Sequence, residues 1–354
     1  MRIQQLTFTR FIASISIVFY HYGINIFPFN FEFFNTIIKK ANIGVSFFFI
    51  LSGFVMIVAY NSKIDINFAD FIKRRLARIY PIYAFSIILL LFYFIIIQLF
   101  FKTEASEIDF KGLILNTFLI QSWYPKYALS FNTPGWSLSV EMFFYTSFPL
   151  LYTYLYKRYS LKIITFSIIL IYIISQVLLH ILLFSNFNHI NSIDRHNLLF
   201  YFPLMHFNEF LIGNLTGMIF INLKNFKNKN YDLLIIGLLI LLIILLKITT
   251  VVNFHNGMLA IIFVPLILFI SGNNGVLTKL FSLKPLVFLG EISFGMYILQ
   301  KPLFFWANGV FKYFNITNVT FIFYIYLISL ISFSALSYTY LETPVRKLIN
   351  KIKL

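Results

Sequence analysis

Residues 82–101 read IYAFSIILLLFYFIIIQLFF, a run of twenty residues without a charge. Similar apolar runs recur at 233–246 and 318–340. A helix needs roughly 20 predominantly apolar residues to cross a bilayer. Stretches close to that length occur about ten times along the 354 residues of the chain. The pattern predicts an all-α, polytopic integral membrane protein.

The composition excludes a water-soluble globular protein. Hydrophobic residues make up 60% of the chain and charged residues 11%, whereas soluble domains carry about 25% charged residues. There is no cysteine, which removes thiol nucleophiles, disulfides and Cys-ligated metals. The formal charge of +16 would suggest nucleic acid in a soluble protein. Here the aromatic-rich spans leave no basic face for a duplex, so we expect a lipid bilayer and no nucleic acid as partner.

Ten membrane-spanning helices are expected, at 6–28, 42–60, 79–101, 136–156, 161–184, 204–222, 231–248, 257–272, 286–307 and 318–341. If both termini are cytoplasmic, 19 of the 28 Lys and Arg residues fall in cytoplasmic segments, which leaves 9 elsewhere. Because basic residues collect on the cytoplasmic side of membrane proteins, this excess predicts cytoplasmic termini. The domain organisation expected is one transmembrane domain at 1–345 and a short basic cytoplasmic tail at 346–354.

Arg10 and His21 are titratable groups inside the first expected span. Such groups are rare in spans because hydrocarbon penalises them unless they are paired or face a wet cavity. Eleven helical positions make about three turns and roughly 16 Å, so the two side chains lie on nearly one stripe. The plainer interpretation is a snorkelling arginine and a core histidine bonded to a carbonyl. The shared stripe favours a functional pair.

Two further sets of charged residues lie in or beside the expected spans: arginines in one set and glutamates in the other. The segment 73–81 is expected to be the cytoplasmic loop into the third span, with Arg75 and Arg78 beside a helix start. Such arginines can bind an anion such as phosphate, although an ordinary basic membrane anchor would have the same composition. Glu141 lies about one turn into the span at 136–156, and Glu209 follows His206 by three positions.

Several familiar motifs are absent from the sequence. We find no P-loop, no dinucleotide-binding glycine motif and no nucleophile elbow. The spacing of His189, Asp194 and His196 matches no standard metal site. We therefore expect no metal.

Six short motifs do occur in order along the chain: Arg10-x(10)-His21, Gly44-Val45-Ser46-Phe47-Phe48-Phe49-Ile50-Leu51-Ser52-Gly53-Phe54, Arg75-x-x-Arg78-Ile79-Tyr80-Pro81, Trp136-Ser137-Leu138-x-x-Glu141, Glu209-Phe210-x-x-Gly213 and Ser293-x-x-x-Tyr297-Ile298-Leu299. In this order they resemble the membrane-bound acyltransferase-3 family of bacterial ten-helix acyltransferases, over essentially the whole chain. The resemblance implies transfer of an acyl group, often acetyl, from coenzyme A to a hydroxyl of a surface glycan. It associates the Arg75–Arg78 pair with the donor and the Arg10–His21 pair with catalysis.

The chain departs from the family pattern at three positions. Thr7 stands where relatives often have an acidic residue, and His206 where they often have an arginine. These two changes affect the charge partners available to Arg10 and Glu209. Gln300 stands where a histidine is common, so no role is carried over to it. Some relatives carry an additional extracytoplasmic esterase-like domain, which we do not expect here.

Acyl transfer to an alcohol needs a base for the hydroxyl proton, stabilisation of the oxyanion and a grip on the donor. His21 is the expected base because imidazole titrates near neutrality, and a carboxylate such as Glu141 could orient it. Arg75 and Arg78 would hold the phosphates of acetyl-coenzyme A, with Arg10 deeper in the bundle.

The predicted function is a multi-pass O-acyltransferase of a bacterial cell membrane. It would move an acyl group from cytoplasmic acyl-coenzyme A to a hydroxyl of a cell-surface or extracellular polysaccharide. Without cysteine, a covalent carrier would have to be histidine or serine, and direct transfer is favoured. A transporter or flippase of a glycan or lipid intermediate is the alternative, since it also carries intramembrane charges. A non-catalytic scaffold or sensor would leave the arginine and glutamate motifs unexplained.

Overall fold

The computed structural model describes residues 3–63, 65–101, 109–185, 191–223, 226–227, 229–248 and 253–352. Within these ranges the regular secondary structure is helical, apart from one isolated β-bridge between Lys229 and Asn273. Five helical segments are long and apolar enough to cross a membrane: Glu32–Tyr60, Phe68–Phe100, Leu161–Phe184, Pro203–Asn222 and Val319–Lys351. The all-α, multi-pass character is thus confirmed, while the number of ten spans and the side of the termini stay predictions.

The helices overlap all ten segments expected from the sequence. In chain order they are α1 Gln5–Val18 with the π-helical turn Phe19–Gly23, α2 Glu32–Ile38, α3 Gly44–Tyr60, α4 Phe68–Phe101, α5 Phe110–Thr117, α6 Trp136–Leu151 with the π-helical turn Tyr152–Tyr156, α7 Leu161–Phe184 and α8 Ser192–Tyr201. They continue with α9 Phe207–Asn222, α10 Asp232–Lys247, α11 Ala260–Gly272, α12 Val276–Phe281, α13 Lys284–Tyr313, α14 Val319–Ser337 with the π-helical turn Tyr338–Glu342, and α15 Thr343–Lys351.

Helix α4 corrects the prediction of a loop at 73–81. It begins at Phe68, and Pro81 lies inside it, where the missing N–H removes only one backbone hydrogen bond. The first turns are stabilised by Asp70, which accepts hydrogen bonds from Lys73 Nζ at 2.7 Å and Arg74 Nη2 at 3.2 Å. The arginine pair therefore stands on a helix, about two and three turns from its start.

Close packing of α3 against α9 depends on glycine. A Cβ atom on Gly213 would collide with the carbonyl of Ile50, and one on Gly217 would lie 2.8 Å from Ile57 Cβ. Glycine at these two positions, four residues apart, lets the two helix backbones approach closely. The contact brings α3 into the centre of the bundle.

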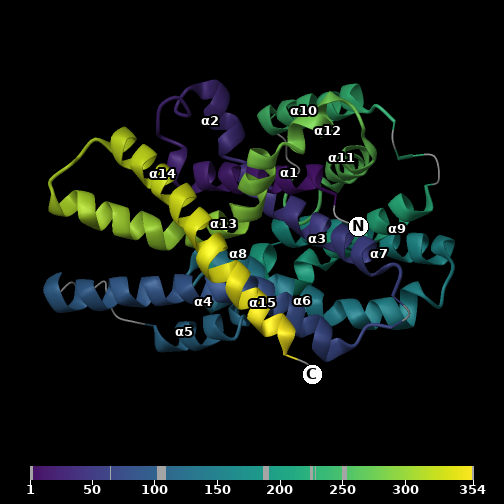
Figure 1. The fold of residues 1–354 in the computed structure, drawn as a ribbon, viewed down its shortest axis with the longest axis horizontal. Coiled ribbons are helices and arrows are strands. Elements are labelled where there is room, and N and C mark those ends of the chain that lie inside the picture. Colours follow the sequence, from purple (N-terminus) through teal and green to yellow (C-terminus); the bar gives the residue numbers. More distant parts are fainter. Residues whose placement is uncertain are drawn as a thin grey trace.

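The outer helices expose apolar side chains. Phe166 on α7 is 70% exposed and Leu233 on α10 is 85% exposed. Exposed apolar surface of this extent marks a face that contacts lipid or protein rather than water. Figure 1 shows α10, α11 and α12 gathered at one corner and α4 with α5 along the opposite edge.

The C-terminal segment is helical and packs against the bundle. The π-helical turn Tyr338–Glu342 leads α14 directly into α15, which packs against α4 (Figure 1). Lys73 Nζ donates a hydrogen bond to the carbonyl of Ile352 at 2.6 Å, which fastens the end of the segment. The boundary expected at 345/346 thus falls inside α15, because an amphipathic helix continues through the basic residues.

Candidate active site

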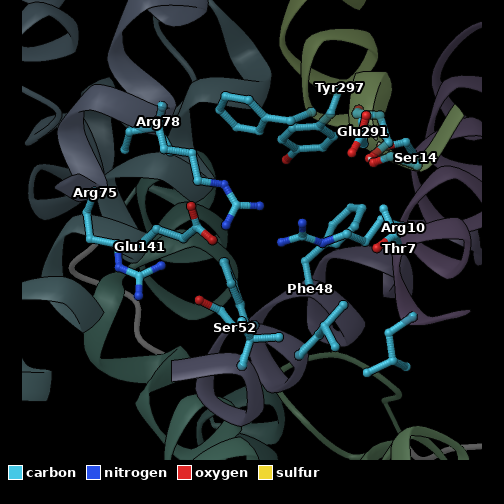
Figure 2. Close-up of a pocket in the computed structure, with 18 of the residues that line it drawn as sticks. Thr7, Arg10, Ser14, Phe48, Ser52, Arg75, Arg78, Glu141, Glu291 and Tyr297 are labelled. Atoms are coloured by element: carbon cyan, nitrogen blue, oxygen red, sulfur yellow. Dashed lines mark hydrogen bonds between the residues drawn. The ribbon is translucent and has the colours of Figure 1, made fainter. Parts of the chain in front are cut away.

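A cavity of about 410 Å³ lies between α1, α3, α4, α6, α13 and the C-terminal segment. Its lining carries four guanidinium groups and three carboxyl groups, from Arg10, Arg75, Arg78, Arg346, Glu141, Glu291 and Glu342. In Figure 2 Arg78 and Glu141 face Arg10 across the open space. The helices therefore bring together four of the five residues expected in the site.

The cavity is elongated along the helices that line it. On α3 it extends from Val45 to Ala59, which is about 21 Å of helix axis. On the N-terminal segment it extends from Ile3 to Ser14, or about 16 Å. His21 does not line it and lies seven positions beyond Ser14, about 10 Å further along the same helix.

Three arginines enter the cavity without a polar partner in the described residues. Neither Arg10, Arg75 nor Arg78 has a hydrogen bond or ion pair within these parts of the chain. Their positive charges act on one another across the cavity. Since buried polar groups in proteins are almost always hydrogen-bonded, this arrangement is suited to an anionic ligand that supplies the missing acceptors.

Aromatic rings hold Arg75 in place. Its guanidinium carbon lies 5.1 Å from the ring centre of Phe71 and 5.7 Å from those of Tyr60 and Tyr145, so the cation contacts the faces of several rings. The Nε atom is buried without a partner. These contacts fix the side chain and leave hydrogen-bond donors for a ligand.

Glu141 finds its partners in the cavity rather than at His21. Tyr145 Oη, one turn further along α6, donates a hydrogen bond to Glu141 Oε2 at 3.0 Å. The carboxyl group also interacts electrostatically with Arg78 and Arg10. The structure thus does not bring Glu141 to His21, because Glu141 lies with the cavity and His21 lies about 10 Å beyond it along α1.

His21 is exposed and sits in the π-helical turn at the end of α1. Its ring contacts those of Tyr20 and Tyr22, at centroid distances of 4.9 and 5.8 Å. The charge of Lys301 on α13 acts on the imidazole. An imidazole and an ammonium group thus belong to the same end of the bundle, outside the arginine-lined cavity.

Sequence reasoning missed Lys301. Its Nζ donates hydrogen bonds to the carbonyl of Phe131 at 2.6 Å and to Thr133 Oγ1 at 2.8 Å. The ammonium group therefore ties α13 to the loop that precedes α6. A lysine inside the expected span at 286–307 was the available signal, since charged groups within spans often mark functional sites.

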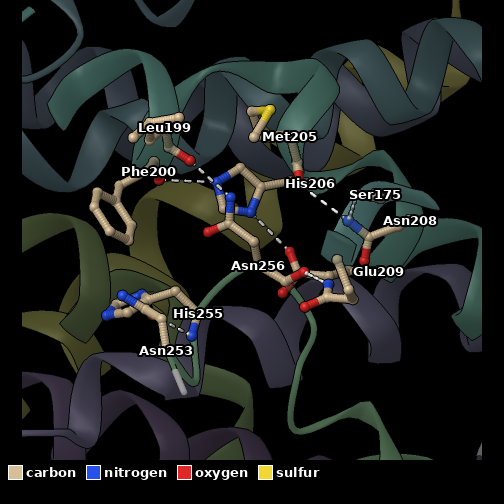
Figure 3. Close-up of polar contacts among 11 residues, drawn as sticks. Ser175, Leu199, Phe200, Met205, His206, Asn208, Glu209, Asn253, His255 and Asn256 are labelled. Atoms are coloured by element: carbon tan, nitrogen blue, oxygen red, sulfur yellow. Dashed lines mark hydrogen bonds and ion pairs between the residues drawn. The ribbon is translucent and has the colours of Figure 1, made fainter. Parts of the chain in front are cut away.

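His206 and Glu209 form a buried pair at the start of α9 (Figure 3). His206 Nδ1 lies 2.7 Å from Glu209 Oε2, and Nε2 lies 2.9 Å from the carbonyl of Phe200. Both side chains are almost inaccessible. The histidine thus supplies the partner of Glu209 where relatives often have an arginine, and both of its ring nitrogens are occupied.

The three departures from the family pattern have distinct structural settings. Thr7 lines the arginine cavity. Gln300 is buried and donates a hydrogen bond from Nε2 to the carbonyl of Tyr297 at 2.8 Å.

No group of three or more potential metal ligands occurs in the part of the chain that is described. His189, one of the residues considered as a metal ligand, lies outside that part.

Comparison with known proteins places the chain among acyltransferases. A family model described as an acyltransferase domain matches residues 3–339. The chain is 25% identical to O-acetyltransferase OatA of Staphylococcus aureus over 330 residues, which cover 86% of this chain and 52% of that protein. It is 40% identical to acyltransferase MdmB of Streptomyces mycarofaciens over 114 residues, or 32% of this chain and 28% of that protein.

A further relative is an uncharacterized protein of Haemophilus influenzae, 28% identical over 65% of this chain and 98% of its own length. The chain spans about half or less of the length of the two named acyltransferases. No solved structure matches it.

Proposed function

We propose that this chain is a membrane O-acyltransferase. It belongs to the acyltransferase family whose model it matches over residues 3–339. The donor would be an acyl-coenzyme A, with acetyl as the acyl group, and the acceptor a hydroxyl group of a cell-surface or extracellular polysaccharide. The name of the relative OatA, an O-acetyltransferase, supports transfer to oxygen. No described feature favours the transporter alternative over this one.

The observation that carries the proposal is the set of unpartnered guanidinium groups in the cavity. Coenzyme A is a polyanion whose phosphates can accept hydrogen bonds from Arg75 and Arg78, and guanidinium groups bind phosphate in a bidentate manner. The cavity follows α3 for about 21 Å, which suits an extended ligand. Arg10, nearer the deep end at Ser14, would meet the part of the donor closest to the thioester.

The proposed reaction is direct transfer. The acceptor oxygen attacks the thioester carbonyl carbon while its proton passes to the imidazole of His21. The tetrahedral intermediate then collapses and the carbon–sulfur bond breaks. The imidazolium of His21 returns its proton to the sulfur, which leaves as the free thiol of coenzyme A. The ammonium group of Lys301 acts on this imidazole and would favour the negative charge that develops on oxygen. Neither a metal nor a covalent carrier enters this scheme.

The membrane arrangement proposed is that of ten spans with both termini in the cytoplasm of a bacterium. The excess of basic residues in the corresponding segments supports it. In that orientation the arginines of α4 lie toward the cytoplasm, where acyl-coenzyme A is available. His21 then lies toward the outer face, where a polysaccharide hydroxyl would arrive.

Donor binding tests the proposal directly. In purified protein, replacing Arg75 and Arg78 together by Ala should weaken coenzyme A binding by about 100-fold or more, because each charge-assisted contact contributes about 1.5–3 kcal/mol. Lysine at either position should restore binding only in part, since the planar fork is lost. Isothermal titration measures both affinities.

Arg74 offers a matched control for this experiment. It lies on the same helix beside Arg75 but is exposed and pairs with Asp70, and it does not line the cavity. Arg74→Ala should bind the donor like the unmodified protein. Unchanged affinity in the Arg75/Arg78 double variant would refute the donor site.

A further inference from the structure

The C-terminal segment forms one wall of the arginine cavity. Tyr338, Glu342 and Arg346 all line it. Residues of α4, which lies much earlier in the sequence, line it as well. From the sequence, Tyr338 was expected in the span at 318–341 and only Arg346 in the cytoplasmic tail. Their presence raises the question of what Arg346 binds.

Arg346 is held at a defined position. Glu342, one turn before it, is buried, and its Oε1 accepts a hydrogen bond from Ser337 Oγ at 3.4 Å. The π-helical turn that contains Glu342 redirects the chain from α14 onto α4. Beyond Arg346, the contact of Lys73 with the carbonyl of Ile352 fastens the far end. The segment is thus attached on both sides of the arginine.

Arg346 adds a fourth guanidinium group to the cavity lining, where its charge also acts on the carboxyl group of Glu342. It has no hydrogen bond or ion pair within the described residues, and its charge acts on Arg78 across the cavity. Four guanidinium groups against three carboxyl groups leave an excess of positive charge. Like charges brought together in a partly buried site repel, so a bound anion would stabilise the arrangement.

The positions of the arginines suggest a division of the donor's phosphates. Arg75 and Arg78 are three residues apart on one helix, about 4.5 Å along its axis, which suits two adjacent phosphates of a diphosphate. Coenzyme A carries a third phosphate on the 3′ oxygen of its ribose, separated from the diphosphate by the sugar. Arg346 approaches from a different helix and is available for that separate group.

We infer that Arg346 binds the 3′-phosphate of the coenzyme A donor, so that the C-terminal segment is a part of the donor site. This inference rests on the proposed function, because it assumes a coenzyme A donor. It makes Arg346 a determinant of specificity for phosphorylated over dephosphorylated donors.

The test compares coenzyme A with 3′-dephospho-coenzyme A as ligands of the purified full-length protein. The unmodified protein should prefer coenzyme A by about tenfold or more, the effect of one charge-assisted contact. Arg346→Ala should lose this preference by binding coenzyme A more weakly while leaving the affinity for the dephosphorylated ligand unchanged. Arg346→Lys, which keeps the charge, should retain part of the preference.

Lys347 provides the matched control, because it is the adjacent cation of α15 but is exposed and does not line the cavity. Lys347→Ala should keep the full preference. Thermal unfolding of each variant identifies loss of fold, and Arg346→Gln replaces any alanine variant that does not fold.

The outcomes separate this inference from the proposed function. Equal weakening of both ligands in the Arg346 variants, or no weakening of either, overturns the assignment to the 3′-phosphate. An unmodified protein that binds coenzyme A without any preference over the dephosphorylated form overturns it as well, but leaves the proposed donor intact. An unmodified protein that binds neither ligand refutes the donor and the inference together.

Discussion

Replacement of His21 by Gln gives the sharpest test of the proposed chemistry. If the imidazole accepts the proton of the acceptor hydroxyl, turnover should fall by a factor of about 10² to 10⁴, the range of general acid–base catalysis. The structure also fixes the expected effect on stability. His21 is exposed and makes no hydrogen bond within the described residues. Its loss should therefore change the free energy of unfolding by no more than about 0.5 kcal/mol.

His206 supplies the contrasting variant. Its ring is buried, and both nitrogens have partners, one of them the buried carboxyl group of Glu209. Removing one member of such a pair costs about 3–5 kcal/mol because the other is left without compensation. His206→Gln should thus lower the melting temperature and the amount of folded protein. The two histidine variants should therefore differ in kind: one loses turnover, the other stability.

The assay follows acetyl transfer from acetyl-coenzyme A in purified protein, with coenzyme A affinity and thermal unfolding measured on the same samples. For His21→Gln we expect near-normal donor affinity and near-normal melting, with turnover reduced at least about 100-fold. A His21→Gln protein that transfers acetyl at the rate of the unmodified protein would refute the role of His21 as base. Glu141, the carboxyl group among the cavity arginines, would then be the next candidate for the base.

Two further predictions concern orientation and the outer end of the bundle. A reporter fused after Lys63 or Lys227 should be cytoplasmic and one inserted near Glu107 external, as measured by paired enzyme reporters; the opposite labelling would reverse the proposed direction of transfer. Lys301→Met should lower turnover by about tenfold or more because it removes a positive charge near the reacting oxygen. Thr133→Val removes one hydrogen bond of that ammonium group but keeps its charge, so it should reduce turnover much less. If the two variants lose the same amount of acetyl-transfer activity, Lys301 has a structural role only.

The sequence predicted most of the helices because their length and composition are properties of local segments. The segment at 161–184 coincides with α7, and that at 136–156 with α6 and its π-helical turn. The helix α4 begins at Phe68, about three turns before the start of the span expected at 79–101. The polar residues before it form a helix through local ion pairs of Asp70 and contact with α15, and the second of these is a long-range contact.

The site was predictable only as far as family motifs reach. Arg10, Arg75, Arg78 and Glu141 do share one cavity, which neither their spacing nor their composition could establish. The contribution of Arg346 was missed, since it depends on the chain returning to α4 after more than 260 residues. The sequence offered Glu141 as a carboxylate that could orient His21, but motifs do not show how far along a helix two groups lie from each other. In the structure Glu141 lines the cavity and His21 lies beyond it along α1.

The separation of the two levels along α1 sets a requirement for the reaction. The cavity ends at Ser14, whose Oγ donates a hydrogen bond to the carbonyl of Ser293 at 2.8 Å, and His21 follows about 10 Å later. A donor bound through its phosphates at α4, as proposed, would have to extend about 10 Å beyond Ser14 for its thioester to meet His21. Binding energy gained at the arginines would then hold the thioester close to the imidazole, where proximity rather than tight ground-state contact accelerates transfer. In the proposed reaction the arginine cavity and the imidazole are two parts of one site, joined by the length of the donor.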